Sequence, residues 1–300
     1  MSLLVVGSMA LDSIATPHGS RENILGGAAT FFSMAARHYV PVSLVAVVGE
    51  DFPEEHVRLL EESGIGTEGL ERRQGGRTFR WRGAYEGRMD VAQTLETQLN
   101  VLGEFRPTLP PTCRETPFVF LANGDPVTQA HVVKQLENPS FVMLDTMNYW
   151  IDAHRENLLA AIDAVDGVIM NDEEALALGE SPILIRAMSN IASRGVRVLI
   201  VKKGEHGSIL LKDGELFALP AYPLEVVRDP TGAGDTFAAG VMGHLAETGD
   251  LSFSNFKKAL AHGTVVASFT VEGFGLERIR EVTREELDRR LQALYEFTAW

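Results

Sequence analysis

Apolar and polar positions along the chain form two kinds of segment. Short, continuous apolar runs bounded by Gly, Asp or Asn occupy residues 3–6, 44–48, 118–121, 141–144, 168–170 and 198–201. Such runs are typical of strands that are buried on both faces of a sheet. Stretches with helical periodicity lie between them, at residues 28–38, 53–63, 126–136, 153–165 and 182–194. Strands that alternate with helices predict an α/β fold with a doubly wound, mostly parallel sheet flanked by helices.

The last third of the chain has a different order. Two apolar segments at 208–211 and 216–219 are separated by Lys212-Asp213-Gly214-Glu215, and the Asp-Gly pair favours a tight hairpin turn. Helical periodicity then covers residues 233–246, 256–269 and 284–296. These helices are expected to cover the sheet, so that residues 1–300 form a single domain.

One segment breaks the alternation of strand and helix. In residues 78–85, Phe79, Trp81 and Tyr85 occupy one face and Arg80 and Arg82 the other. A period of two with one polar face is typical of a half-buried antiparallel strand. We expect a small accessory sheet made by about residues 12–20 and 76–90. An edge strand of the main sheet is the alternative.

The charge of the chain restricts its partners. The 300 residues are 45% hydrophobic and 23% charged, as in a folded protein, and their formal net charge is −14. This field repels nucleic acid and anionic membrane surfaces, so an anionic ligand must be attracted by local N–H groups. We therefore expect a small-molecule substrate, with no nucleic acid and no membrane as partner.

The cysteine content and the first residues favour the cytoplasm. Cys113 is the one cysteine in the sequence, which allows no disulfide within the chain. The N-terminus lacks a basic region, and Asp12 comes too early for a signal peptide. Apolar runs also stay well short of the roughly 18 residues of a membrane span. A cytoplasmic location is the expectation.

The string Asp229-Pro230-Thr231-Gly232-Ala233-Gly234-Asp235 combines an anion site with a carboxylate. Its glycines let several N–H groups converge where a loop becomes a helix, and the helix dipole favours an anion there. A phosphoryl group in transfer is such an anion, and Asp235 would accept the proton of an attacking hydroxyl. The alternative is a plain helix cap, because Asp is favoured in the first turn of any helix.

Motifs of other enzyme classes are absent from the sequence. It contains no Gly-x-x-x-x-Gly-Lys-Ser/Thr loop, no Gly-x-Gly-x-x-Gly after the first strand, no His-Glu-x-x-His and no Gly-x-Ser-x-Gly. P-loop ATPases, ordinary NAD enzymes, metalloproteases and serine hydrolases are therefore disfavoured.

The seven-residue string, followed by Thr236-Phe237, resembles the signature of the PfkB/ribokinase family of carbohydrate kinases. Matching stretches occur along the whole chain, at residues 7–12, 26–27, 171–174 and 201–207. The resemblance implies a ribokinase-like fold with a small β lid. It also implies ATP-dependent phosphoryl transfer to a hydroxyl of a small polyhydroxy substrate.

The resemblance assigns roles around the transferred phosphate. Asp235 would be the general base, and the backbone of Gly232, Ala233 and Gly234 would form the anion hole. The substrate would be bound by Asp12 with the glycine pair Gly26 and Gly27.

The resemblance also assigns residues to metal ions and to the nucleotide. Asn171 and Glu174 would organise the Mg²⁺ shell, largely through water, as suits a small cation that keeps its waters. A helix start with Asn171 as cap is the alternative for this pair. Asp229 and Thr231 would help to bind a monovalent cation such as K⁺.

The residues placed around ATP by the resemblance are Lys202, Gly204, Gly207, His262, Gly273 and Gly275. Lys202 would bring a positive charge near the phosphates, although a solvated strand end is the alternative. His262 would contact the adenine region, with a packing residue as its alternative.

The sequence departs from the family pattern at Phe31, where ribokinase-type members commonly carry a sugar-contacting Asn. Phe31 and Phe32 are either core residues of the helix at 28–38 or an apolar wall for a ring. The missing amide disfavours ribose or a simple hexose and leaves polyols and nucleosides open.

By resemblance, the accessory strand belongs to a lid that excludes water from the phosphoryl group. Arg80, Arg82 or Arg88 would reach the substrate from it, or else lie in solvent. Lids of relatives often pair between two subunits, so a homodimer through the lid is expected.

Three functional hypotheses follow. The leading one is an ATP-dependent sugar or polyol kinase with Asp235 as base. The alternatives are a nucleoside kinase of the same family and a metabolite-binding protein that kept the fold without the chemistry.

Overall fold

The computed structural model describes residues 1–87, 89 and 92–299, and a nine-stranded sheet lies at its centre. The strand order is β13-β12-β11-β10-β9-β8-β1-β4-β5. The strands are β1 Leu3–Val6, β4 Val42–Gly49, β5 Ile65–Arg73, β8 Phe118–Leu121, β9 Phe141–Asp145, β10 Gly167–Asn171, β11 Val198–Lys202, β12 Ser208–Lys212 and β13 Glu215–Leu219. Strands β11 to β5 pair in parallel, and β12 and β13 add an antiparallel hairpin at one edge. The doubly wound, mostly parallel sheet predicted from the sequence is confirmed.

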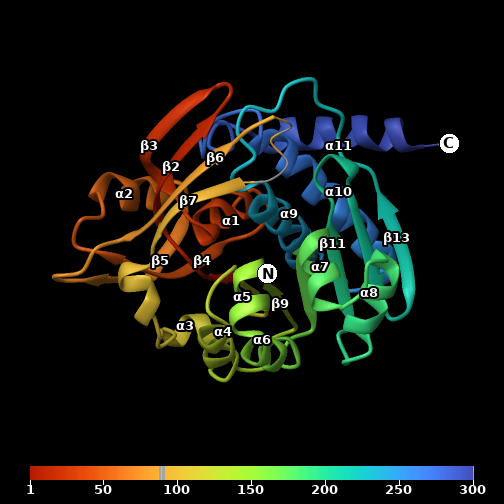
Figure 1. Ribbon diagram of the computed structural model, residues 1–300, viewed down its shortest axis with the longest axis horizontal. Helices are drawn as coiled ribbons and strands as arrows, with labels where there is room; N and C mark the ends of the chain where they lie inside the picture. The colour runs from red at the N-terminus through yellow and green to blue at the C-terminus, as the bar shows by residue number, and fades with distance from the viewer. Residues whose placement is uncertain (88, 90–91, 300) are drawn as a thin grey trace.

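Helices cover both faces of this sheet (Figure 1). One core includes residues of α1 Ala28–Ala36, α2 Glu54–Glu62, α9 Ala233–Thr248, α10 Phe253–Thr270 and α11 Arg284–Thr298. The other includes residues of α3 Pro111–Arg114, α4 Pro126–Val133, α5 Asn148–Ala153, α6 Arg155–Ile162, α7 Asp172–Leu178 and α8 Leu184–Ala192. In β1, Leu3 and Val5 belong to the first core, and Leu4 and Val6 to the second. The runs are continuously apolar because both faces of each strand are buried.

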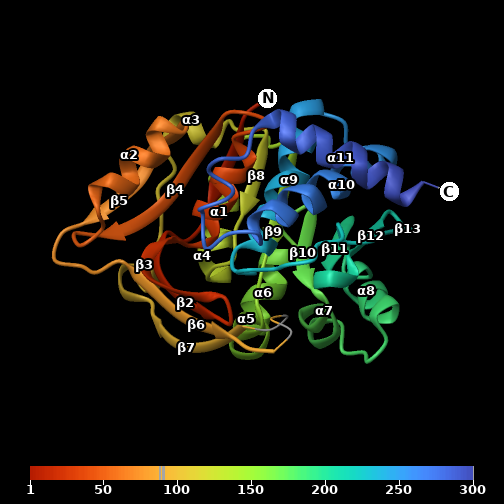
Figure 2. The same cartoon turned by 90° about the horizontal axis from the view of Figure 1, so that it is seen from above.

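A second sheet of four strands is separate from the first (Figure 2). It has the order β3-β2-β6-β7, with β2 Ala10–Thr16, β3 Gly19–Gly26, β6 Phe79–Tyr85 and β7 Ala92–Gln98. β6 pairs with β2 in parallel and with β7 antiparallel, so it is not an edge strand of the main sheet. We call these four strands the small sheet.

Some predicted bounds differ from those of the structure. The helix expected at 153–165 is shorter in the structure, where it is α6, Arg155–Ile162; α5 ends just before it at Ala153, and His154 between them has a φ of −134°. Strands β3, β5 and β7 were not predicted. Part of the range expected for the accessory sheet, including Arg88, lies outside the described residues. Among the helices that the structure describes, none has the length and apolarity needed to cross a bilayer.

Candidate functional site

The carboxyl ends of the central parallel strands bring polar residues together at one edge of the main sheet. Asp145 ends β9, Asn171 ends β10 and Lys202 ends β11. Asn171 and Lys202 are partners in the strand register, and Asp145 faces Ile169 of β10. This edge is where ligands bind in open α/β sheets.

The loop at 229–235 leads directly into α9, as the sequence predicted. Gly232 is the residue before the helix and has a φ of 77°, a conformation that favours glycine. Asp235 lies in the first turn, where the dipole of the helix is positive. The Ala233 N–H already donates to the Pro230 carbonyl oxygen at 3.1 Å, so this predicted anion-hole donor is engaged in the turn.

The Phe31 ring packs against the turn at Gly232. A Cβ on residue 232 would meet the Phe31 ring, so the ring and the Gly232 backbone are in close approach. Phe31 is buried, and Phe32 stacks on Phe120 with ring centroids 4.2 Å apart. Both phenylalanines are therefore core residues, the first of the two interpretations left open by the sequence.

Lys202 lies over the same turn. A Cβ on residue 234 would be 3.0 Å from the Lys202 Nζ. The ammonium pairs with the buried Asp145 carboxylate at 3.2 Å. Burial alone would lower the pKa of Lys202, but the carboxylates of Asp145, Glu174 and Asp235 raise it. The lysine is thus a half-buried, ion-paired cation, not a solvated strand end.

The predicted base Asp235 and the predicted substrate ligand Asp12 influence each other. Burial raises the pKa of Asp235 to about 7; Asp145 adds to this and Lys202 opposes it. Burial also raises the pKa of Asp12 to about 7. The charge of Asp235 raises this pKa as well, whereas the hydrogen bond from the Gly27 N–H lowers it. Two carboxyls from β2 and α9 therefore lie within electrostatic reach of each other.

Gly26 and Gly27 leave room for close packing around Asp12 and Ser8. A Cβ on residue 26 would collide with the Asp12 carboxyl, and Gly27 has a φ of 95°. A Cβ on residue 27 would lie 2.5 Å from the Ser8 carbonyl oxygen. The structure brings this predicted substrate group together, with Asp12 in β2, Gly26 at the end of β3 and Gly27 directly after it.

Asn171 and Glu174 form a capping box at the start of α7. The Asn171 Oδ1 accepts from the Glu174 N–H at 2.8 Å, and the Glu174 Oε2 accepts from the Asn171 N–H at 2.7 Å. Burial raises the pKa of Glu174 to about 7, although Lys202 lowers it. Within the described residues, no group of three or more His, Cys, Asp or Glu is arranged as a metal site. The capping alternative is present; a metal role stays a prediction.

Asp229 links two loops. One carboxylate oxygen accepts from the Thr231 N–H at 2.9 Å, and the other accepts from the Gly275 N–H at 2.8 Å. Gly273 lies in the same loop as Gly275, against Arg278. The residues predicted for a monovalent cation are therefore adjacent, and the carboxylate between them is bonded to the backbone.

The small sheet touches both of these loops. Thr231 donates to the Tyr85 hydroxyl of β6 at 3.3 Å. Arg21 of β3 pairs with Glu277 at 2.9 Å and lies over the Phe274 ring at 4.6 Å. A Cβ on residue 275 would be 2.7 Å from Ile24.

The arginines of β6 are paired with carboxylates of the chain. Arg80 pairs with Asp51 at 3.0 Å, and Arg82 lies 3.7 Å from Glu22 at the surface. Asp51 also accepts from the N–H and the hydroxyl of Thr78, both at 2.7 Å. Asp51 follows β4 and Thr78 precedes β6, so this contact joins the two sheets.

Two other predicted nucleotide residues are at the edge of the site and one lies elsewhere. Gly204 and Gly207 form the turn between β11 and β12, with φ values of 53° and 85°. His262 is 8% exposed, stacks on His244 with centroids 4.2 Å apart and contacts the Tyr39 hydroxyl at 3.2 Å. The packing alternative for His262 is therefore present in the structure, and its contact with the adenine region stays a prediction.

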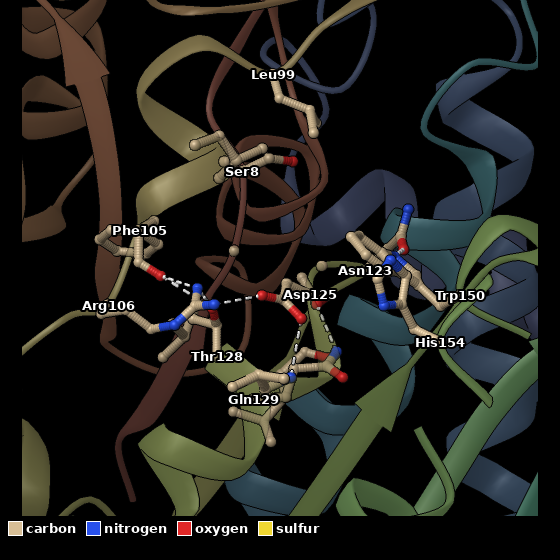
Figure 3. A pocket seen from close by; sticks show the side chains of 18 of the residues that line it. Ser8, Leu99, Phe105, Arg106, Asn123, Asp125, Thr128, Gln129, Trp150 and His154 are labelled. Atoms are coloured by element: carbon tan, nitrogen blue, oxygen red, sulfur yellow. Dashed lines mark hydrogen bonds and ion pairs between the residues drawn. The ribbon is translucent and has the colours of Figure 1, made fainter. Parts of the chain in front are cut away.

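A cavity of about 340 Å³ adjoins the carboxyl ends of β1 and β8. Figure 3 shows Asn123 and Trp150 on one side of it and Arg106, Asp125 and Thr128 on another. Sequence reasoning missed this cavity and also missed Asp145. One feature of the sequence could have pointed to Asp145: like Asn171 and Lys202, it directly follows an apolar run.

Comparisons with known proteins give a consistent result. A sequence profile described as pfkB family carbohydrate kinase matches residues 2–281. The chain is 26% identical over 248 residues to the cytidine kinase of Thermococcus kodakarensis, which covers 81% of this chain and 87% of that protein.

Two solved structures share the fold. The nucleoside kinase of Methanocaldococcus jannaschii matches with a TM-score of 0.78 and 23% identity, over 97% of this chain and 98% of that one. A ribokinase-type protein from E. coli, in complex with ATP and Mg²⁺, matches with a TM-score of 0.81 and 18% identity, over 97% and 99%. The ribokinase-like fold expected from the resemblance is confirmed.

Proposed function

The chain belongs to the pfkB family of carbohydrate kinases, and from this membership we propose that it transfers the γ-phosphate of ATP to a hydroxyl of a nucleoside. The observation that carries the proposal is the position of Asp235. This half-buried carboxyl lies at the N-terminus of α9, with the Lys202 ammonium over the same turn and Asp12 within electrostatic reach.

These residues account for a complete transfer step. Asp235 takes the proton as the substrate oxygen attacks the γ-phosphorus, and the bond from phosphorus to the bridging oxygen breaks, so that ADP leaves. The N–H groups of Gly232 and Gly234 at the start of α9 and the Lys202 ammonium stabilise the negative charge of the group in transfer. Asp12 and the backbone at Gly26 and Gly27 hold the sugar hydroxyls.

The nucleoside assignment is favoured over a free sugar or polyol by the relatives. The cytidine kinase matches over most of both chains, and the M. jannaschii structure is also named a nucleoside kinase. The substrate predicted first from the sequence, a sugar or polyol, is an arm of the experiment below.

Mg²⁺ is part of the proposal. Asn171 and Glu174 supply oxygen ligands of the kind that this cation prefers, and each oxygen engaged by one N–H keeps further acceptor capacity. Mg²⁺ would supply positive charge to the phosphates, held by these two residues through water. We propose that the chain acts as one kinase domain, with the small sheet as its lid. K⁺ binding, the homodimer and the cytoplasmic location stay predictions.

The experiment is an ATP-consumption assay over nucleosides, free sugars and polyols. We expect turnover with nucleosides, and Asp235→Asn to lower kcat by about 10²–10⁴-fold with ATP binding retained. The matched control is Asp288→Asn, which makes the same change in an exposed ion pair of α11.

Two results would contradict the proposal in different ways. Turnover of free sugars or polyols alone would reject the nucleoside assignment and leave the base in place. Near-normal turnover by Asp235→Asn would reject Asp235 as the base.

A further inference from the structure

The cavity beside β1 and β8 has no part in the transfer step described above. Its volume of about 340 Å³ lies within the usual range of small-molecule sites, about 300–1,000 Å³. It is lined by the ends of both strands, by the loop after β7 and by residues of α4 and α5. We ask which molecule would occupy it.

Strand order assigns the cavity to the acceptor half of the site. Lys202, Asn171 and Asp145 stand at the ends of β11, β10 and β9, on the side of the predicted ATP phosphates. The cavity begins at the next two strands, β8 and β1. Ser8 in its lining accepts from the Ala28 N–H at 3.0 Å, directly beside Gly27. The cavity therefore continues from the place predicted for the sugar hydroxyls.

Its walls suit a flat, neutral ring. Tyr149 is 51% exposed and meets Trp150 with ring centroids 4.8 Å apart, while Leu99, 41% exposed, lies on another side (Figure 3). Exposed aromatic and aliphatic surfaces around a cavity favour an apolar ring. Arg106 forms an ion pair with Asp125 at 2.7 Å, so the charges on this side of the cavity neutralise each other.

Asn123 presents hydrogen-bond donors in this cavity. The Trp150 indole N–H contacts its Oδ1 at 3.1 Å, and an indole N–H only donates, so the oxygen of the amide must face it. The Asn123 Nδ2 is left with the Met147 sulfur at 3.2 Å, a weak acceptor. A better acceptor on a ligand would replace that contact.

We propose that this cavity holds the heterocyclic base of the nucleoside and that Asn123 donates a hydrogen bond to a carbonyl or ring nitrogen of that base. Trp150 is a positioning residue, because it fixes which atom of the amide points to the base. This inference rests on the proposed function and adds to it the residue that distinguishes a nucleoside from a free sugar.

The test is calorimetric binding of cytidine and inosine to the full chain and to Asn123→Asp. The substitution keeps an oxygen for the Trp150 N–H and removes the donor, so nucleoside affinity is expected to fall about tenfold, the scale of one hydrogen bond. Affinity for ATP and for ribose, which lacks a base, is expected to stay within about twofold. Asn138→Asp, the same change on an exposed loop before β9, is the control.

Trp150→Phe supplies a second variant that keeps the aromatic wall. It is expected to weaken nucleoside binding less than Asn123→Asp does, at an unchanged melting temperature. The base site is overturned if Asn123→Asp binds nucleosides like the wild type, or if ribose and nucleosides weaken together. If the wild-type protein binds neither nucleoside, both the proposed function and the base site are rejected. If the protein turns over nucleosides and Asn123→Asp has no effect on their binding, only the base site is rejected.

Discussion

At the scale of single residues, the site depends on one half-buried, ion-paired ammonium. Lys202 is surrounded by Asp145, Glu174 and Asp235, and its closest partner is Asp145 at 3.2 Å. A buried charge without a partner is strongly unfavourable. Asp145 therefore has a structural task that is separate from any contact with a ligand.

Asp145→Asn is expected to destabilise the protein by about 3 kcal/mol, because the ammonium loses its charged partner. The double variant Asp145→Asn with Lys202→Met removes both charges and should recover much of that loss while staying inactive. Urea unfolding of the single and double variants measures the difference. A single variant as stable as the wild type would show that the ion pair contributes nothing.

Gly232 is the second residue whose identity has a defined physical reason. Gly64 provides a matched control, because both glycines have a φ of 77°. A Cβ on residue 64 would meet no heavy atom of the described chain within 4 Å, whereas one on residue 232 would meet the Phe31 ring.

Gly64→Ala is expected to cost about 1 kcal/mol of unfolding free energy for its backbone conformation. Gly232→Ala should cost about 1–3 kcal/mol more, because the Phe31 ring must move. Adding Phe31→Leu should return part of that extra cost. Equal losses in the two alanine variants would contradict the close approach.

Site residues that lie in one continuous string could be predicted, and those that depend on distant partners could not. The string at 229–235 shows its glycines and its carboxylate together. Asp145 owes its importance to Lys202, 57 residues later, and Asn123 to Trp150, 27 residues later. Nothing in the local sequence indicates these contacts.

At the scale of elements, the unpredicted strands share a position. β5 is an edge of the main sheet, and β3 and β7 are the two edges of the small sheet. Their residues are mostly exposed or half-buried, so they lack the continuous apolar run that marks an interior strand. The edge strand β13 was found because the Asp213-Gly214 turn indicated its hairpin.

Asp51 connects the elements that must move together for a lid to work. It binds Thr78 at the start of β6 and pairs with Arg80 within β6. It stands two residues after the end of β4 in the main sheet. The Asp51 side chain therefore links the small sheet to the main sheet.

Asp51→Ala is expected to lower the unfolding free energy by only about 1 kcal/mol, since the contact is partly exposed. The larger effect should be on coupling, because a loosened lid admits water to the phosphoryl group. We expect more ADP released per substrate phosphorylated. Asp163→Ala, which breaks a surface pair with Arg194, is the control and should leave that ratio unchanged.

At the scale of the whole molecule, three carboxyls with raised pKa values give stability and activity opposite responses to pH. Burial raises the pKa values of Asp12, Asp235 and Glu174 to about 7. In the unfolded chain they release their protons near pH 4. Between about pH 4 and pH 7 the native state thus binds more protons than the unfolded state, so its stability falls as pH rises.

Unfolding free energy is therefore expected to decrease from about pH 5 to pH 7 and to level off above, while kcat/KM rises through about pH 7 as Asp235 loses its proton. Denaturant titrations and rate profiles over the same buffers measure both. The double variant Asp12→Asn with Asp235→Asn should flatten much of the stability slope. Stability that rises with pH in this window would contradict the raised pKa values of these carboxyls.

The overall architecture could be predicted from the sequence because it follows from burial. Each interior strand of the main sheet lies between two hydrophobic cores, and that condition is written in consecutive residues such as Leu3 to Val6. The small sheet has open edges, so its aromatic strand β6 was the evident one, with part of β2 expected beside it from the range 12–20.

The contacts of the small sheet with the loops at 231 and 273–277 have a consequence for turnover. Tyr85, Arg21 and Ile24 contact these loops, which border the donor half of the site as proposed above, whereas the proposed lid covers the acceptor half. The sheet cannot lift from the acceptor without leaving these loops. Both products then leave by the same route. We expect the opening of the small sheet to be the rate-limiting step of the cycle, and to limit the release of ADP and of the phosphorylated product equally.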